Sequence, residues 1–496
     1  MESYENFEEK VKKISNIQQA AAVLGWDQEV MMPEEGIKPR SQQKSALTSV
    51  THGLMTDKKL GELIEQLEDE DLSEEQRANI REVKREKKKA VKVPEDLLKK
   101  ISETESEAVD AWKKSREQDD FQKFAPHLEK MVELKREYAG HIDPDEEPYK
   151  VLFKDFEPFI RFETMEEILQ TLKDRLTEIT EKIKESDSSL EKGAFKGQFS
   201  EEKQKKLNRE LVEALNFDFS RGRLDVSTHP FTSGNRYDTR ITTRYNEQDL
   251  SKSILPTVHE TGHGLYNQGL PEESFGVPAG SSRDLSVHES QSRLWENHVA
   301  RSKPFMKFLL PKLREKFPEQ FEEVTADECY ESVNQVYEDN PIRVEADELT
   351  YHLHIVVRFE LGKELVNGDI AVEELPEKWN DKMEQYLGFR PENDAEGCLQ
   401  DIHWGWGNFG YFPTYTVGSV LAAQIFEAAS QDIDSLDQKI EEGEFDPLLE
   451  WLRENIHSKG KVLKTEDLIK EATGRKPTPE PFISYIEEKY SDLYSL

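Results

Sequence analysis

Cysteine is nearly absent from this chain of 496 residues, and so are long apolar runs. Cys329 and Cys398 are the only two cysteines. They are too few for a disulfide framework in a chain of this length, which favours a reducing compartment. The first residues are acidic and lack an apolar signal region, and no apolar run approaches the length of a membrane span. We therefore expect a cytoplasmic protein without membrane partners, in which both cysteines are packed or idle.

Positive charge is also scarce. The chain has 67 lysines and arginines against 102 aspartates and glutamates, a net charge of −35. This balance argues against nucleic acid and anionic membrane surfaces as partners. It favours basic over acidic substrates, although the charge of a whole chain says little about one groove. A charged fraction of 34% with only 35% hydrophobic residues is typical of long helices with solvated outer faces.

Apolar residues at helical spacing recur along most of the chain and predict a mainly α-helical protein. No low-complexity linker or internal repeat interrupts them, so we expect a single domain over residues 1–496. The first helix should break at residues 26–33, and a loop-rich joint is expected at 141–158. Helices are predicted at residues 5–25, 71–92, 165–186, 201–215, 304–317, 326–337, 348–365 and 417–429.

The pattern changes at residues 217–246, where turn and strand residues replace helical periodicity. Residues 238–245 alternate and are rich in β-branched side chains, which predicts a small sheet. A strand there can hold an extended peptide by main-chain pairing.

Directly after this stretch comes the sequence His259-Glu260-Thr261-Gly262-His263. On a helix, positions i and i+4 share one face, so both imidazoles can reach one metal ion. Glu260 can then reach a water on that metal, as zinc hydrolysis requires. Residue frequencies predict roughly 0.04 such patterns by chance, so a third ligand is the test.

Glu289 supplies that ligand, thirty residues after His259, in a helix expected over residues 286–300. Two histidines and a glutamate leave one position for water, which is typical of a catalytic rather than a structural zinc site. We therefore expect one zinc ion per chain, held between residues 259 and 289. Cobalt or manganese can occupy such a site in its place.

Six motifs carry a resemblance to a known family. The chain resembles the carboxypeptidase Taq family of metallopeptidases over essentially its whole length, and the stretch at residues 24–27 is also similar. The six motifs stand in the family's order and are His229-Pro230-Phe231, Asp238-Thr239-Arg240-Ile241-Thr242, His259-Glu260-Thr261-Gly262-His263, His288-Glu289-Ser290, Ile342-Arg343-Val344-Glu345-Ala346-Asp347 and Gly397-Cys398-Leu399-Gln400-Asp401-Ile402-His403-Trp404.

The resemblance implies a nearly all-helical fold with two lobes, a deep central groove and a small sheet beside the zinc. It also implies cytoplasmic homodimers that remove residues one at a time from the C-termini of peptides, with broad specificity. In such an enzyme Glu260 is the general base, which takes a proton from the zinc-bound water and passes it to the leaving amine.

An exopeptidase must also recognise the terminal carboxylate of its substrate, and arginine suits this task because it binds carboxylates bidentately. Arg343 and Arg240 stand in family motifs and are the candidates for substrate binding. Each can equally be a structural ion-pair partner, Arg240 of Asp238 and Arg343 of Asp347.

The oxyanion of the tetrahedral intermediate needs hydrogen-bond donors besides zinc. His229 and Tyr415 are favoured by resemblance to the wider group of helical zinc peptidases, with His403 and Tyr411 as further candidates in the groove. We expect Asp347 and Asp401 to orient the ligand imidazoles.

Three other histidines have a plainer interpretation. His288 precedes a ligand and can simply pack against the core. His352 and His354 point to different faces of a helix, so a second metal site there is not expected. The glycine- and aromatic-rich stretch at residues 405–415 is either a mobile groove wall or a tightly packed turn.

Two other functions stay open at this point. A zinc oligopeptidase or dipeptidyl-type enzyme can use the same kind of helical groove. A non-catalytic helical metal-binding protein belongs to a different class, and it would tolerate the loss of Glu260.

Overall fold

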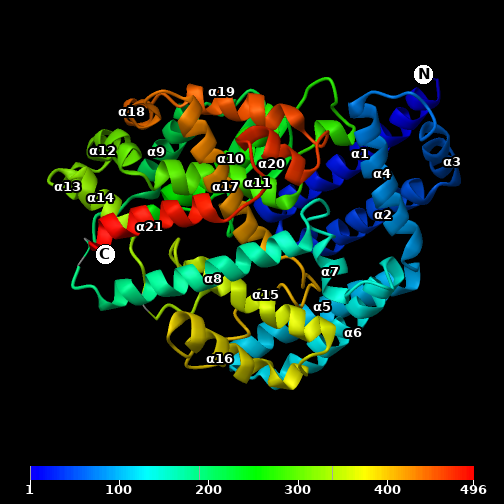
Figure 1. Ribbon diagram of the computed structural model, residues 1–496, viewed down its shortest axis with the longest axis horizontal. Coiled ribbons are helices and arrows are strands. Elements are labelled where there is room, and N and C mark those ends of the chain that lie inside the picture. The colour runs from blue at the N-terminus through cyan, green and yellow to red at the C-terminus, as the bar shows by residue number, and fades with distance from the viewer. Residues whose placement is uncertain (1, 189, 191, 338) are drawn as a thin grey trace.

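The computed structural model describes residues 2–188, 190, 192–337 and 339–496. Its helices form two lobes, one above the other in Figure 1. The lower lobe contains α5 (Glu95–Gln118), α6 (Ala125–Ile142), α7 (Pro148–Phe153), α8 (Phe162–Glu185), α15 (Tyr351–Asn367) and α16 (Leu375–Leu387).

The upper lobe contains both ends of the chain and the predicted metal ligands (Figure 1). Its N-terminal helices are α1 (Glu2–Val30), α2 (Ile37–Thr56), α3 (Lys58–Leu67) and α4 (Glu74–Lys92). The others are α9 (Glu201–Ala214), α10 (Ser251–Gly269), α11 (Leu285–Arg293), α12 (Lys303–Lys316), α13 (Pro318–Phe321), α14 (Ala326–Val333), α17 (Pro413–Asp432), α18 (Leu436–Glu442), α19 (Asp446–Asn455), α20 (Thr465–Thr473) and α21 (Glu480–Tyr494).

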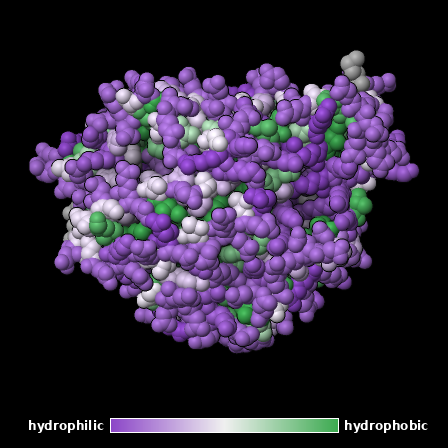
Figure 2. All heavy atoms as spheres, viewed as in Figure 1, coloured by the Kyte–Doolittle hydropathy of each residue, from purple (hydrophilic) through white to green (hydrophobic). Residues whose placement is uncertain are grey.

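The face of the molecule seen in Figure 2 is mainly hydrophilic, with small apolar areas scattered over it. This agrees with the expectation of helices whose outer faces are solvated. No helix in the described part of the chain combines the length and the hydrophobicity needed to cross a membrane.

The small sheet lies where the sequence predicts it. Its strands are β1 (Gly222–Val226), β2 (Thr232–Asn235) and β3 (Asp238–Thr243), in the order β1-β3-β2. β3 pairs in parallel with β1 and antiparallel with β2. Ile241 at its centre is fully buried, and α10 approaches it closely at Gly264, where a Cβ would lie 3.0 Å from the Ile241 side chain. The mainly α-helical class with a small sheet is therefore confirmed.

Several predicted boundaries are wrong. The first helix ends inside the predicted break, at Val30, five residues beyond its expected end at residue 25. Trp26 is buried there, with the guanidinium of Arg240 over its ring at 4.4 Å, so tertiary packing extends the helix. The joint at 141–158 contains the short helix α7, and the helix expected to reach residue 337 ends at Val333.

The helix expected over residues 286–300 changes character midway. α11 ends at Arg293, and a π-helical segment (Leu294–Ala300) follows it. Such widened turns are rare and occur frequently at functional sites, where they re-aim side chains. This segment is fully buried.

Two glycines set how closely α10, α11 and α17 approach one another. A Cβ on Gly262 would lie 2.6 Å from the carbonyl oxygen of Gln291 and 2.8 Å from the Cα of Ser292 on α11. A Cβ on Gly418 of α17 would lie 2.6 Å from the Cγ of Glu289. Neither position leaves room for a side chain, so the contact distances between these three helices depend on glycine.

We expect Gly262→Ala to lower the free energy of unfolding by about 1–3 kcal/mol, because the added methyl group meets backbone atoms that cannot move aside cheaply. Urea unfolding followed by circular dichroism measures this change. Gly53→Ala is the control, since Gly53 lies in α2 with open space around it. That variant should gain about 0.5–1 kcal/mol from helix propensity. Equal stability of the two variants would contradict the close crossing of α10 and α11.

Candidate metal centre and substrate site

His259 and His263 on α10 and Glu289 on α11 are brought together by the fold. Oε2 of Glu289 lies 3.7 Å from Nε2 of His259 and 3.5 Å from Nε2 of His263. One ligand atom from each residue lies within 4.8 Å of the other two. Ligands placed about 2.1 Å from a tetrahedral ion stand about 3.4 Å apart. The donor set and its spacing therefore fit one small divalent ion.

Glu296 orients the first imidazole. Its Oε2 lies 2.8 Å from Nδ1 of His259, and it also accepts hydrogen bonds from Arg293 and Arg301, each at 3.2 Å. Nδ1 of His259 then carries the proton, which leaves Nε2 free to ligate. Glu296 was missed in the sequence, yet a signal exists: it stands seven residues after Glu289, close to the same helix face.

The carboxylates around the metal centre are ionised. Burial alone would raise the pKa of Glu289, but Arg293 and the two imidazoles outweigh it and hold that pKa well below its ordinary range. Nε of Arg293 donates to Oε1 of Glu289 at 2.7 Å. Burial lowers the pKa of His259, but Glu289 and Glu296 more than offset this and raise it. The site therefore presents negative charge to a cation.

Glu260 is fixed by the sheet. The Thr232 hydroxyl of β2 donates to Oε2 of the Glu260 side chain at 2.6 Å and lies 3.1 Å from the Glu260 carbonyl oxygen. Glu260 is buried, and one of its carboxylate oxygens is thus already bonded. The sheet's clearest contact with the site is this threonine, a contact that strand periodicity does not reveal.

Arg343 does not pair with Asp347. Its Nη2 donates to Oδ1 of Asp401 at 2.7 Å, and its Nη1 donates to the Tyr351 hydroxyl at 3.2 Å. Asp347 instead accepts hydrogen bonds from the backbone and hydroxyl of Thr350, just before α15. The expected pairing of Arg343 with Asp347 is wrong because the Asp347 carboxylate is consumed in capping its own segment.

Asp401 accepts hydrogen bonds from two arginines. Nε of Arg358 on α15 donates to Oδ2 of Asp401 at 2.6 Å, while Arg343 occupies the other oxygen. Nη2 of Arg358 is buried without a hydrogen-bond partner among the described residues. Burial lowers the pKa of His403 to about 4, so this neighbouring imidazole is neutral. Neither Asp347 nor Asp401 is hydrogen-bonded to a ligand imidazole, and the orienting role expected of them belongs to Glu296 at His259.

Aromatic rings connect these arginines to the metal centre. The ring of Tyr351 lies under the guanidinium of Arg293 at 5.0 Å, and the Tyr415 ring lies 5.5 Å from that of Arg343. Tyr411 packs edge-on against Tyr415 at 5.2 Å and stacks on His403. Four of the predicted substrate-site residues therefore form one cluster: Arg343, His403, Tyr411 and Tyr415.

The remaining two candidates lie on the sheet side. Arg240 makes a bidentate pair with Asp238, at 2.9 and 2.8 Å, so its structural interpretation fits the geometry. His229 is exposed, and its imidazole makes no hydrogen bond with the residues that the structure describes. It stands three residues before Thr232, which contacts Glu260.

The other histidines pack as the plainer interpretation expects. The His288 ring stacks on His263 with centroids 4.4 Å apart, and Nδ1 of the buried His352 lies 3.0 Å from the Thr416 hydroxyl. No second cluster of three metal-binding side chains occurs among the described residues. The stretch at 405–415 is a packed turn, since a Cβ on Gly410 would lie 2.5 Å from the backbone nitrogen of Phe153.

The sequence profile of the carboxypeptidase Taq (M32) metallopeptidases matches residues 6–490. The chain belongs to this family. It is 40% identical to thermostable carboxypeptidase 1 of Pyrococcus furiosus, over 97% of each chain, and 36% identical to carboxypeptidase 1 of Bacillus subtilis, over 99% of this chain and 98% of that one. The M32 carboxypeptidase of Deinococcus radiodurans superposes with a TM-score of 0.96 over all of both chains, at 33% identity. The protein is a metallocarboxypeptidase that depends on a divalent metal.

Glu296→Gln should weaken metal binding by this carboxypeptidase about 10–100-fold, because loss of the orienting carboxylate leaves the His259 ring unfixed. Competition with a chromophoric chelator measures the dissociation constant. The control is Glu273→Gln, which removes the same charge from an exposed position after α10. Unchanged metal affinity in Glu296→Gln would show that the hydrogen bond does not support the ligand.

Proposed function

We propose that the metal of this carboxypeptidase is zinc, held by His259, His263 and Glu289, and that the enzyme releases single residues from peptide C-termini with broad specificity. The observation that carries this proposal is the spacing of two imidazole nitrogens and one carboxylate oxygen, which suits tetrahedral zinc. When bound, zinc acidifies water and polarises a carbonyl group.

Glu260 is the general base of the proposed reaction. Thr232 occupies its Oε2, so Oε1 is the oxygen that takes the proton from the attacking water. The same carboxyl group then delivers that proton to the leaving amine. Because Thr232 fixes the carboxylate from the sheet side, the base needs no rearrangement before proton transfer.

Arg343 is the residue that binds the terminal carboxylate of the substrate. Two buried arginines share the single carboxylate of Asp401, so their cluster carries one positive charge without a counterion. The terminal carboxylate of a bound substrate would supply the missing counterion. Arg240 is the weaker candidate, because its guanidinium is already paired with Asp238 and stacked on Trp26.

Tyr415 and His229 are the proposed oxyanion donors. Burial raises the pKa of Tyr415 well above its ordinary value, so the hydroxyl keeps its proton and can donate at neutral pH. Tyr411 and His403 line the same cluster and position the released residue. His229 lies in the segment before β2, three residues before Thr232, which contacts Glu260.

We also propose that residues 1–496 form one catalytic domain that acts on peptides in the cytoplasm as a homodimer. One continuous core joins helices from both lobes, from Val93 to Tyr494, which supports a single domain over that part of the chain. α1, α3 and α4 form a second, smaller core, which includes Val277 from the rest of the chain. The two free cysteines are buried, as suits a reducing compartment. The homodimer rests on family resemblance.

Glu260→Gln should lower kcat by about 10²–10⁴-fold while the metal affinity stays near that of the wild type, because the side chain holds the proton and not the ion. Activity on a short peptide and metal content by atomic absorption give the two measurements. Retained turnover with full metal content would overturn the assigned base.

A peptide and its C-terminally amidated twin test the exopeptidase reaction. Stepwise loss of residues from the free acid alone is expected, whereas internal cleavage of both peptides would indicate an oligopeptidase. Arg343→Ala should reduce kcat/KM on the free acid by about 30-fold or more, equivalent to about 2 kcal/mol, because a buried charge pair is lost. If the ratio of acid to amide cleavage does not fall in this variant, Arg343 does not bind the terminal carboxylate.

A further inference from the structure

A cavity of about 900 Å³ lies between α1, α2 and α4 of the upper lobe and α5 and α6 of the lower lobe. Asn408 and Phe156 are among the residues that line it. The Phe156 ring packs edge-on against Tyr411, with centroids 5.2 Å apart. One lining side chain, Phe156, therefore connects the cavity to Tyr411 in the cluster proposed to bind the peptide.

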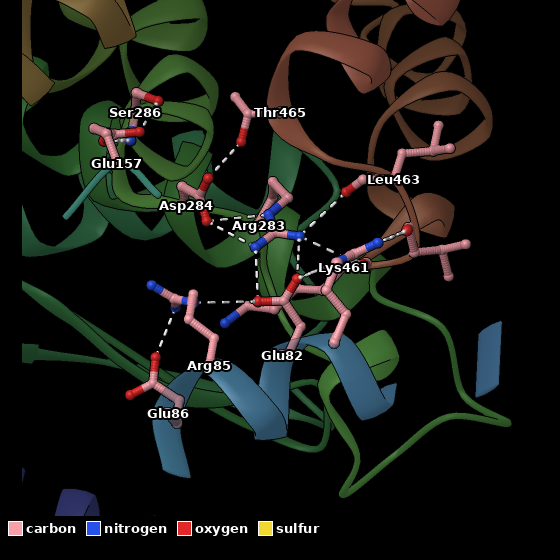
Figure 3. Close-up of polar contacts among 12 residues, drawn as sticks. Glu82, Arg85, Glu86, Glu157, Arg283, Asp284, Ser286, Lys461, Leu463 and Thr465 are labelled. Atoms are coloured by element: carbon pink, nitrogen blue, oxygen red, sulfur yellow. Dashed lines mark hydrogen bonds and ion pairs between the residues drawn. The ribbon is translucent and has the colours of Figure 1, made fainter. Parts of the chain in front are cut away.

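Each carboxylate that lines this cavity is already paired. Glu82 accepts two hydrogen bonds from Arg283, at 3.0 and 3.2 Å (Figure 3). Glu86 pairs with Arg85 at 2.6 Å, also visible in Figure 3.

Asp155 is the third carboxylate of the cavity. It pairs with Lys89 at 2.8 Å and accepts the Tyr138 hydroxyl at 2.9 Å. No lining carboxylate is left to balance a further cation.

Two further cations line the cavity, Lys135 of α6 and Lys461. Neither side-chain nitrogen makes an ion pair or hydrogen bond with any residue that the structure describes. The Lys135 nitrogen lies 4.6 Å from the centre of the Tyr138 ring. The Lys461 carbonyl accepts hydrogen bonds from Arg81 and Arg283, at 2.7 and 3.3 Å. The contact with Arg283 places the Lys461 backbone beside the buried charge network (Figure 3).

Both lysines are half-buried, and burial lowers the pKa of each. Besides Asp155, Glu105 acts on Lys135 but does not line the cavity. Glu82 and Asp284 act on Lys461, and both already pair with Arg283. Partly desolvated cations without a partner are costly, and an incoming carboxylate would remove that cost. Apolar side chains such as Ile14 and Ile101 line the same space and suit the methylene groups of such a ligand.

We propose that this cavity binds acidic side chains of the peptide substrate, at residues upstream of the scissile bond, with Lys135 and Lys461 as the cationic partners. The proposal rests on the carboxypeptidase reaction proposed above. It reverses, at this one place, the preference for basic substrates that a net charge of −35 suggests. The charge of the surface and the charge of the cavity thus differ in sign.

The test compares peptides that differ only by glutamate or glutamine at one upstream position, scanned along the peptide. In the wild-type enzyme, glutamate should raise kcat/KM about tenfold at one or more positions. In Lys135→Gln/Lys461→Gln this ratio should fall to about one, while cleavage of an all-neutral peptide stays unchanged. Lys88→Gln is the control, since Lys88 is exposed on α4 and does not line the cavity. No preference in the wild type, or an unchanged preference in the double variant, overturns the proposal.

Measurements of peptide binding test this site independently of the catalytic reaction. Calorimetry with Glu260→Gln measures the affinity for the same peptides without turnover, with and without the two lysine substitutions. A glutamate preference that depends on the lysines supports the site even if Glu260 proves not to be the base. Free glutarate provides the other arm: if it binds at the lysines while glutamate within a peptide gives no gain, the cavity takes a separate small anion and the proposal fails.

Discussion

The contact between α10 and α11 is the constraint on which the metal centre depends. Two helices whose axes normally lie 8–10 Å apart must bring side-chain atoms of His263 and Glu289 to 3.5 Å. Gly262 permits this on the side of α10, and Gly418 lets α17 close over Glu289 from the other side. The spacing of the metal ligands is therefore a consequence of how closely the helix backbones pack.

Charge balance around that crossing explains much of the rest. Glu289 and Glu296 are two buried carboxylates close to one another, and Arg293 contacts both. The guanidinium groups of Arg293 and Arg343 both contact the ring of Tyr351, so this one aromatic ring connects the metal centre to the arginine pair. Near the metal negative charge is in excess, which suits a cation. At the arginine pair positive charge is in excess, which suits a substrate carboxylate.

Local sequence patterns correctly predicted the helices and strands that depend on neighbouring residues in the sequence. The spacing of His259 and His263 follows from helical geometry, and the alternation before α10 correctly predicted β3. Predictions failed where a distant partner decides the outcome. Trp26 continues its helix because it packs against Arg240 of the sheet, although its neighbours resemble a helix end. Asp347 lies four residues from Arg343 but caps its own segment, while the partner comes from Asp401.

The sequence by itself predicted the class of chemistry, because two histidines one turn apart, with a glutamate beside the first, are typical of a metal site with a base. It determined the family as well, since six ordered motifs persist through the chain. Only the tertiary structure decided which carboxylate supports His259, which oxygen of Glu260 is free, and that two arginines share the one carboxylate of Asp401. These depend on side chains far apart in sequence meeting at distances of a few ångströms, and periodicity carries no information about such meetings.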